Sequence, residues 1–473
     1  MIRWFLSLAC IQRLDYTYPS FLIEGRMRFS GTRTCVCFFA LLFSALTAGL
    51  IAQQGAPAAQ ISTSDLQRAH LMLRQSYDEI RKNYYDATFH GVDLDKTFQQ
   101  YNTRLDASKS INETFRVMGA FVLNLHDSHT FFMPPTRTNH STPGFLMQII
   151  GDKCFVTHIR PGTDAANKLH VGDQVLALNG FKITPENFHD MEYFIQVLSP
   201  APAEMVDVLN PAGQHRQETI KATLRMGKQV IDISGADDTN GDFWQLVREY
   251  EDDEHLSKSR AYETGDVFVW RMPTFEVPLA DVDKAAGKAM KSKTLIIDLR
   301  DNSGGYIETL KAMLGHFVDH EVKLGDRVMR KETKPEMIKP RSPLYTGTVI
   351  VLVDHNSASA AELFARVIQL EHKGKVIGDR SAGAVMEAKD FEESTGTDYK
   401  IEYGLSITAA NILMSDGKSL ENVGVVPDEL MIPTAADLAA GNDPVLSHAV
   451  SLGGAKLDAV AAGKLFPYEW PIL

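Results

Sequence analysis

Cysteine is scarce in this chain, whose 473 residues include only four cysteines. Three of them, Cys10, Cys35 and Cys37, lie within the first 58 residues, so the remainder contains Cys154 alone. A single cysteine forms no internal disulfide and supplies no cysteine cluster for zinc. Cys154 falls in an apolar strand pattern, which predicts a core residue, and we expect no metal site.

Positive charge is also in deficit. The chain has 48 Lys and Arg residues against 60 Asp and Glu residues, a formal net charge of −12, and without the first 58 residues the charge becomes −15. A protein with this excess of negative charge repels the phosphate backbone of nucleic acid, so nucleic acid is not the expected partner. The sequence has no internal repeat or low-complexity block. Its 44% apolar and 23% charged residues are typical of a soluble globular protein with two or three domains.

Long apolar runs are absent except for residues 35–52, which approach the length of a membrane span. A basic stretch starting at Met27 precedes this run, and the small residues 56–58 offer a cleavage site. This pattern is typical of an export signal, so residues 1–58 are expected to be a mis-called start plus a signal peptide. A retained membrane anchor is the alternative. With cleavage, the protein is exported to the periplasm or outside the cell, without stable membrane insertion.

Residues 59–140 have the apolar periodicity of a small helical region. The region ends in Leu125-His126-Asp127-Ser128-His129-Thr130, where two histidines flank an aspartate. A lone histidine is usually structural, although its pKa also suits acid–base chemistry. Both interpretations stay open at this point.

From residue 141 to 234 the pattern changes to short alternating strands, which predict a compact β module. Its run from Val171 to Gly180, VGDQVLALNG, resembles that of a PDZ domain. Such modules capture peptide carboxyl termini by strand addition, with loop N–H groups holding the carboxylate. The resemblance places this substrate-binding loop at Gly144-Phe145-Leu146-Met147, with Leu146 where the usual loop has a second glycine.

Residues 235–440 alternate strands with helices, which predicts an α/β core with buried, largely parallel strands. One strand leads into Gly304-Gly305, a pair that lets the backbone approach a ligand closely or simply makes a turn. Residues 403–407 and 412–414 are expected to form a hairpin. The Ala- and Leu-rich residues 441–473 predict one terminal helix and a tail.

A strand, a tight turn and a helix are predicted around Ser357-Ala-Ser359-Ala-Ala-Glu362. A serine at the start of a helix lies among unpaired backbone N–H groups, which suits a nucleophile whose substrate passes through an oxyanion. Ser359 and Glu362 also have the spacing of an ordinary capping box. Spacing alone does not separate these two interpretations.

Four motifs together resemble those of the carboxy-terminal processing (tail-specific) serine peptidases and of the tricorn core protease. In chain order they are Asp298-Leu-Arg-Asp-Asn-Ser-Gly-Gly305, Ser357-Ala-Ser-Ala-Ala-Glu362, Gly378-Asp-Arg-Ser-Ala-Gly383 and Gly424-Val-Val-Pro-Asp428. The resemblance implies a crotonase-like α/β catalytic core with an inserted PDZ-like module and an N-terminal helical region. It makes Ser359 the nucleophile and assigns the oxyanion hole to Ala360 and the Gly304-Gly305 turn.

The chain departs from the Ser-Lys branch of this family, because Ala384 stands where that branch has its lysine. A serine hydroxyl needs a base within hydrogen-bond reach. The tricorn-like branch uses histidine and glutamate, and Asp127-Ser-His129-Thr130 and the stretch from Glu421 to Asp428 resemble the segments that carry them. The resemblance therefore implies a triad of His129, Ser359 and Glu421, with His126 as the alternative base.

The expected function is that of a serine endopeptidase that hydrolyses unfolded or tail-exposed polypeptides through an acyl-enzyme, without a metal or organic cofactor. A homo-oligomer is compatible with the sequence but not required by it. The alternative is a non-catalytic peptide- or ligand-binding protein on the same fold, which the missing lysine favours. Convergence of His129, Glu421 and Ser359 in space would favour the enzyme.

Overall fold

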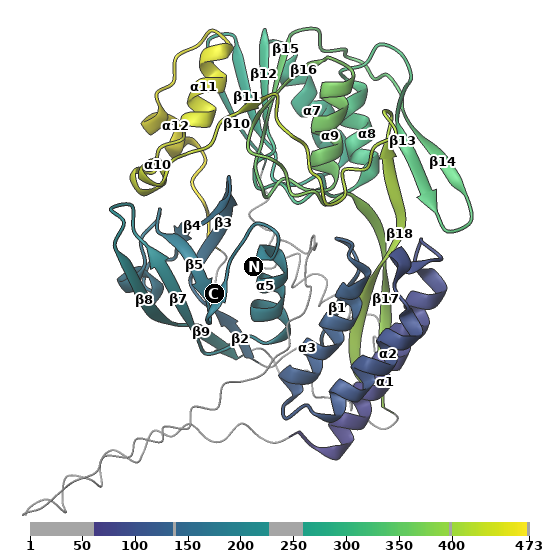
Figure 1. Ribbon diagram of the computed structural model, residues 1–473. Coiled ribbons are helices and arrows are strands. Elements are labelled where there is room, and N and C mark those ends of the chain that lie inside the picture. The colour runs from purple at the N-terminus through teal and green to yellow at the C-terminus, as the bar shows by residue number, and fades with distance from the viewer. Residues whose placement is uncertain (1–60, 136–138, 227–258, 397–399, 471–473) are drawn as a thin grey trace, which may run out of the picture.

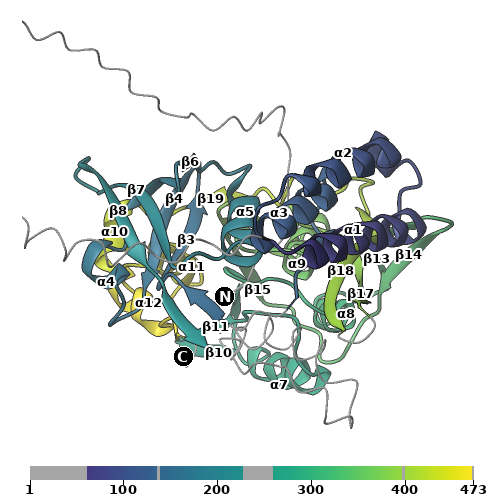
Figure 2. The same ribbon diagram turned by 90° about the horizontal axis from the view of Figure 1, so that it is seen from below.

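The structure is a computed structural model that describes residues 61–135, 139–226, 259–396 and 400–470 (Figure 1). The predicted leader of residues 1–58, with three of the four cysteines, lies outside these ranges. The helical region and the β module lie side by side against the α/β core (Figures 1 and 2). Among the described residues, no helix combines the length and apolar character that a membrane crossing requires.

The α/β core contains a six-stranded sheet. Its first strand is antiparallel to the second, and every later pair is parallel, as predicted. The strands are, in sheet order, β10 (Arg260–Thr264), β11 (Val267–Arg271), β12 (Thr294–Asp298), β15 (Thr348–Val353), β16 (Gly374–Gly378) and β19 (Glu429–Leu430).

Apolar side chains cover both faces of this sheet. Alternate residues of β11, such as Phe268 and Val269, enter two different clusters. One cluster includes α7 (Leu279–Ala289), α8 (Ile307–Gly315) and α9 (Ala360–Leu370), and the other includes α11 (Pro444–Leu452) and α12 (Ala459–Leu465). Burial on both faces explains why the central strands are continuous apolar runs.

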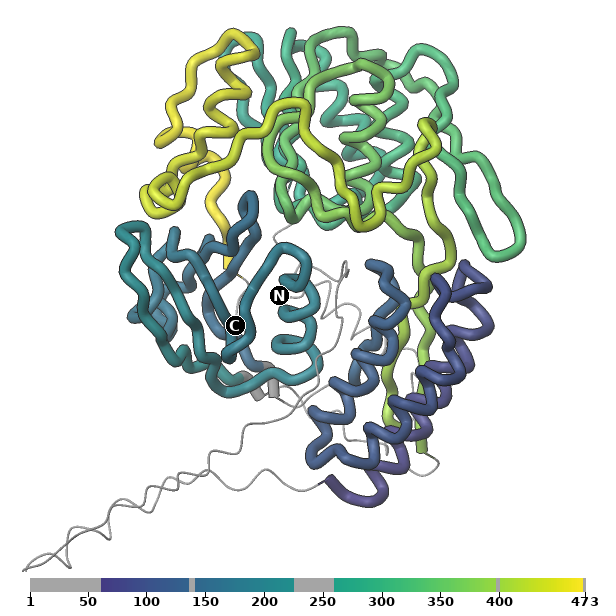
Figure 3. The backbone as a smooth tube through the Cα atoms, in the orientation of Figure 1, coloured from purple at the N-terminus to yellow at the C-terminus, as the bar shows by residue number. Residues whose placement is uncertain are grey.

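The C-terminal region was predicted as one helix, and this was wrong. It contains two helices, α11 and α12, with Pro444 starting α11, and it follows α10 (Ala435–Ala440), which ends at Gly441 with φ 67°. The tube view follows this segment past the β module (Figure 3). There α10 packs so closely that a Cβ on Gly172 would lie 2.5 Å from the carbonyl oxygen of Ala435.

A second sheet joins the core to the N-terminal helices. Its strands are β1 (Phe131–Met133), β13 (Val322–Met329), β14 (Thr333–Ile338), β17 (Met386–Thr395) and β18 (Ile401–Met414). The predicted hairpin at 403–414 is wrong, because these residues belong to one long strand, β18, which pairs with β17. Tyr403 and Leu405 pack with α1 (Thr63–Asn83), α2 (Leu94–Asp106) and α3 (Ile111–Val122).

The β module is present as a six-stranded antiparallel sheet. Its elements are β3 (Phe145–Ile150), β4 (Lys153–Ile159), α4 (Ala165–Lys168), β5 (Gln174–Leu178), β6 (Phe181–Lys182), α5 (Phe188–Glu192), the π-helical η3 (Tyr193–Leu198), β7 (Ala203–Leu209) and β8 (His215–Lys221). A ribbon of β2 (Asn139–Thr142) and β9 (Thr223–Met226) adjoins it. Cys154 is buried, as predicted.

Candidate active site

Ser359 lies at the junction of β15 and α9, with φ 50° and ψ −117°. A positive φ is uncommon for a non-glycine residue and tends to persist where the surrounding structure enforces it, often at functional sites. Ser357 is different, because its buried hydroxyl donates to the Leu299 carbonyl (2.8 Å) and accepts from the Asp354 N–H (2.9 Å). The hydroxyl of Ser357 therefore stabilises the turn, whereas Ser359 is partly exposed.

Glu362 does more than complete a helix cap. Its buried carboxylate accepts hydrogen bonds from the N–H groups of Ser359 (3.1 Å), Gly383 (2.8 Å) and Ala384 (2.8 Å), and from the hydroxyl of Ser381 (2.6 Å). Burial raises the pKa of Glu362 to about 7, and these hydrogen bonds oppose that rise. The carboxylate therefore fixes the 381–384 loop against the start of α9.

The histidine loop is held by Asp127, whose carboxylate is buried. It accepts from the N–H groups of His129 (3.0 Å) and Thr130 (2.8 Å). The hydroxyls of Thr408 (2.6 Å) and Tyr84 (2.6 Å) donate to the same carboxylate. Tyr84, which directly follows α1, and Thr408 of β18 thus fix the backbone that carries His129.

His129 and Glu421 are connected through Ser128. The hydroxyl of Ser128 lies 2.7 Å from His129 Nδ1 and donates to Glu421 Oε2 (2.8 Å), which also accepts from the Val385 N–H (2.8 Å). The N–H of Ser128 donates to Glu421 Oε1 (2.7 Å). The resemblance implied that Glu421 orients the imidazole of His129, and the structure places the Ser128 hydroxyl between the two groups.

This chain of hydrogen bonds selects a tautomer. Because the Ser128 hydroxyl donates to Glu421, it can only accept from His129, so the proton lies on Nδ1 and Nε2 keeps its lone pair. Burial lowers the pKa of His129 to about 4. Burial, followed by the charge of Asp127, raises the pKa of Glu421 to about 8. The imidazole is therefore neutral at neutral pH and able to accept a proton.

Ser359 and Glu421 contact the same short segment. The N–H of Ser359 donates to the Ala384 carbonyl (2.9 Å), and the next residue, Val385, donates to Glu421. Among the described residues, no hydrogen bond joins the Ser359 hydroxyl to the His129 ring, and catalytic contacts are often long without substrate. The side chain of Ala384 is fully buried beside Ala358.

The glycine turn lies directly against the serine. A Cβ on Gly304 would be 2.6 Å from Ser359 Cβ and 3.0 Å from the Ala360 nitrogen. The N–H of Gly304 donates to Asn302 Oδ1 (2.8 Å), which leaves the N–H of Gly305 as the donor that this turn can offer to an oxyanion. The N–H groups of Ala360 and Gly305 have no acceptor in the part of the chain that the structure describes.

His126 does not take part in the described hydrogen bonds that connect His129, Ser128 and Glu421. Its side chain is exposed, its φ is 55°, and its carbonyl accepts from Asn422 Nδ2 (3.4 Å). Among the described contacts, none joins its ring to Glu421. Ser128 and Asp127 are the residues whose roles sequence reasoning missed, although both lie beside the histidine it identified.

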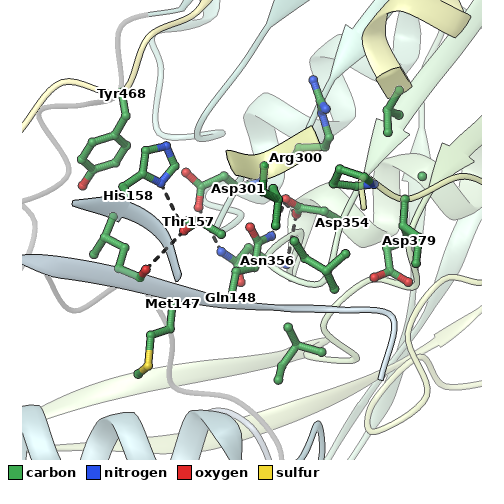
Figure 4. A pocket seen from close by; sticks show the side chains of 18 of the residues that line it. Met147, Gln148, Thr157, His158, Arg300, Asp301, Asp354, Asn356, Asp379 and Tyr468 are labelled. Atoms are coloured by element: carbon green, nitrogen blue, oxygen red, sulfur yellow. Dashed lines mark hydrogen bonds between the residues drawn. The ribbon is translucent and has the colours of Figure 1, made fainter. Parts of the chain in front are cut away.

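The predicted substrate-binding loop lies at the start of β3. Gly144 has φ 81°, and a Cβ there would lie 2.7 Å from the Thr163 hydroxyl, so only glycine fits. Leu146 and Met147 line a cavity of about 310 Å³, shown in Figure 4. Phe145 instead packs into the core of the β module.

Residues 266–431 match the model of peptidase family S41, and residues 69–122 match the tricorn protease C1 domain. The first match contains the core with Ser359, and the second covers most of the predicted helical region. Both matches agree with the resemblance to processing and tricorn-like peptidases that the motifs indicated.

Among curated proteins, the chain is 23% identical over 356 residues to the tail-specific protease of Haemophilus influenzae, covering 70% of this chain and 48% of that protein. It is 29% identical over 138 residues to the carboxy-terminal processing protease CtpA of Bacillus subtilis, covering 29% and 28%. Tricorn protease homolog 1 of Streptomyces coelicolor is 23% identical over 426 residues, covering 82% and 36%. The chain spans about half the length, or less, of these relatives.

Solved structures of the protein CPAF have a similar fold. Mature CPAF matches with a TM-score of 0.59 at 15% identity, over 80% of this chain and 95% of that chain. Its complex with lactacystin matches with a TM-score of 0.60, at 15% identity, over 85% and 99%. At this identity the likeness concerns the fold alone.

Proposed function

We propose that this chain is a serine endopeptidase that cleaves unfolded or tail-exposed polypeptides through an acyl-enzyme. The observation that carries the proposal is the hydrogen-bonded series His129, Ser128 and Glu421, which ends at the segment that also binds the Ser359 backbone. The reported relatives are named as proteases. The alternative of a non-catalytic binding protein has no such support.

In the proposed reaction, Ser359 Oγ attacks the scissile carbonyl while His129 Nε2 accepts its proton. Ser128 and Glu421 keep the imidazole oriented through their hydrogen bonds, and the Ser128 hydroxyl accepts a hydrogen bond from the Nδ1 proton in both the neutral and the protonated form. The N–H groups of Ala360 and Gly305 hold the oxyanion, where the loss of one donor typically costs about 3 kcal/mol of transition-state stabilisation. His129 then returns the proton to the leaving amine and activates the water that releases the acyl group.

The proposal extends to the modules around the site. The α/β residues 235–440 form a crotonase-like core, residues 59–140 a helical region, residues 141–234 a PDZ-like module that binds substrate, and residues 441–473 a C-terminal segment. The edge strand β3 and the Gly144 turn support substrate binding by the module. Residues 1–58 export the protein to the periplasm or beyond, and no metal or cofactor is required.

The direct test incubates the purified chain without residues 1–58 with casein and, separately, with a fluorophosphonate probe. We expect casein cleavage, and labelling that mass spectrometry locates at Ser359. Ser359→Ala should lose both, whereas Ser451→Ala, an exposed serine on α11, should retain both. Cleavage that persists at the wild-type rate in Ser359→Ala and in His129→Ala would refute the proposal.

A further inference from the structure

A cleft of about 310 Å³ lies between the β module and the α/β core (Figure 4). Leu146, Met147 and Gln148 of β3 line one side of it, and Tyr193 and Val197 of η3 also contribute. The core side supplies acidic and amide side chains at the ends of its strands. The core residues that line it with polar side chains include Asp301, Asp354, Asn356 and Asp379.

The strand β3 can accept a further strand. It lies at the end of its sheet and, among the described residues, pairs only with β4. An extended peptide added along such an edge gains main-chain hydrogen bonds and directs alternate side chains to each face. The side chains of a peptide bound there would therefore enter the cleft.

Glu192, the last residue of α5, lines this cleft and is partly exposed to it. Its carboxylate has no hydrogen bond or ion pair with any residue that the structure describes. Burial raises the pKa of Glu192 to about 8, and the neighbouring carboxylate of Glu204 acts in the same direction. A buried carboxylate without a counter-charge is unfavourable as an anion, and a cation placed beside it offsets that cost.

The arginines of the cleft do not supply that cation. Arg300 donates to Asp298 (2.8 Å) and to Asp443 (2.9 and 2.7 Å), and Arg271 donates to Asp298 (3.2 Å). Each of these cleft-lining guanidinium groups is therefore already paired with a carboxylate of the core. The cleft keeps an acidic excess next to an edge strand.

We propose that Glu192 selects a lysine or arginine side chain of a polypeptide segment bound along β3. The half-buried Leu146 lines the cleft with apolar surface suited to the methylene stem of such a side chain. That the bound segment belongs to a substrate rests on the proposed peptidase function, whereas the binding itself requires no catalysis.

The experiment measures binding to the catalytically inactive Ser359→Ala protein. The probe is a fluorescein-labelled alanine–serine peptide in which one lysine is moved through successive positions, with norleucine as the uncharged counterpart. At the favoured position, lysine should bind on the order of tenfold more tightly than norleucine. Glu192→Gln, which preserves the shape of the side chain, should remove this difference, and Glu192→Lys should favour a glutamate peptide instead.

Glu218→Gln, on strand β8 and outside the cleft, is the matched control and should keep the preference for lysine. Because Glu192 must be ionised to pair with lysine, the affinity for the lysine peptide should fall as the pH drops below about 8. The affinity for the uncharged norleucine peptide should stay the same over this pH range. Equal binding of both peptides at every position, no binding at all, or a preference that survives Glu192→Gln would overturn the inference. Casein cleavage by the wild type tests the peptidase function separately.

Discussion

At the scale of single residues, the site depends on a hydroxyl that holds two titratable groups together. Ser128 accepts from the imidazole and donates to Glu421, so one small side chain sets both the tautomer and the orientation of His129. In its absence the Nδ1 proton would have no buried acceptor, and an unsatisfied buried donor is costly. Ser128 is therefore a positioning residue for the proposed reaction.

We predict that Ser128→Ala lowers kcat for peptide hydrolysis by about 10²-fold, the lower range for general base catalysis, with little change in KM. The reason is that the buried Ser128 is out of reach of a bound substrate, whereas its loss removes the group that orients the base. Ser128→Thr retains a hydroxyl and should recover much of the rate. Steady-state kinetics check the prediction, and equal losses in the alanine and threonine variants would contradict it.

The sequence could propose Ser359, His129 and Glu421 as candidates because each lies in a short motif with a distinctive residue pattern. It could not reveal the bridging role of Ser128, because that role depends on Glu421, which is 293 residues away in the chain. Gly304 shows a related limit. The glycine predicts a close approach of the backbone, but only the structure shows that the Gly304 N–H donates a hydrogen bond to the Asn302 side chain.

At the scale of elements, the start of α9 and the 381–384 loop form one unit around Glu362. Four donors face its carboxylate. An acceptor-only group suits that arrangement, whereas an amide would direct its own N–H toward one of these donors. The element that presents Ser359 therefore depends on a buried carboxylate.

We predict that Glu362→Gln lowers the free energy of unfolding by about 1–3 kcal/mol, the usual cost of an unsatisfied buried polar group. Denaturant unfolding followed by circular dichroism measures this change. Glu371→Gln, at the other end of the same helix, is the matched control and should change the stability little. An equal effect of both substitutions would show that Glu362 has no special role.

The elements themselves were predictable where local patterns determine them. The buried run 349–353 and the helix after Ser359 were predicted correctly because apolar strands and capped helices have distinctive sequences. The β17 strand was missed, since its residues Met386–Thr395 are largely polar and half-exposed, although they pair with β18. Its exposure hides the apolar periodicity on which such predictions depend.

At the scale of the whole molecule, the β module contacts the loops that carry the site. Gln148 Nε2 donates to Asp354 Oδ2 (2.7 Å), and the Gly151 N–H donates to Asp379 (2.6 Å). The other oxygen of Asp354 accepts from the N–H groups of Asp301 and Asn356. Substrate bound along β3 would thus lie next to the loops that precede the oxyanion turn and Ser359.

We predict that Gln148→Ala lowers kcat/KM for casein by roughly tenfold, about the effect of a lost hydrogen bond to a charged group. The rate of fluorophosphonate labelling at Ser359 should stay near that of the wild type, because a small probe does not use the cleft. Gln217→Ala, on β8, serves as control and should alter neither rate. Equal loss of labelling and cleavage in Gln148→Ala would contradict this division of roles.

The central claim is that His129, held by Ser128 and Glu421, accepts the proton of Ser359. The most direct measurement is the second-order rate constant for fluorophosphonate labelling of Ser359 across a pH range, in the wild type and in His129→Gln. The wild-type rate should rise as the pH increases through about 4, where His129 loses its proton. His129→Gln should be slower by about 10²–10⁴-fold and lack that rise. Labelling of another residue, or the same rate and pH profile in both proteins, would contradict the account.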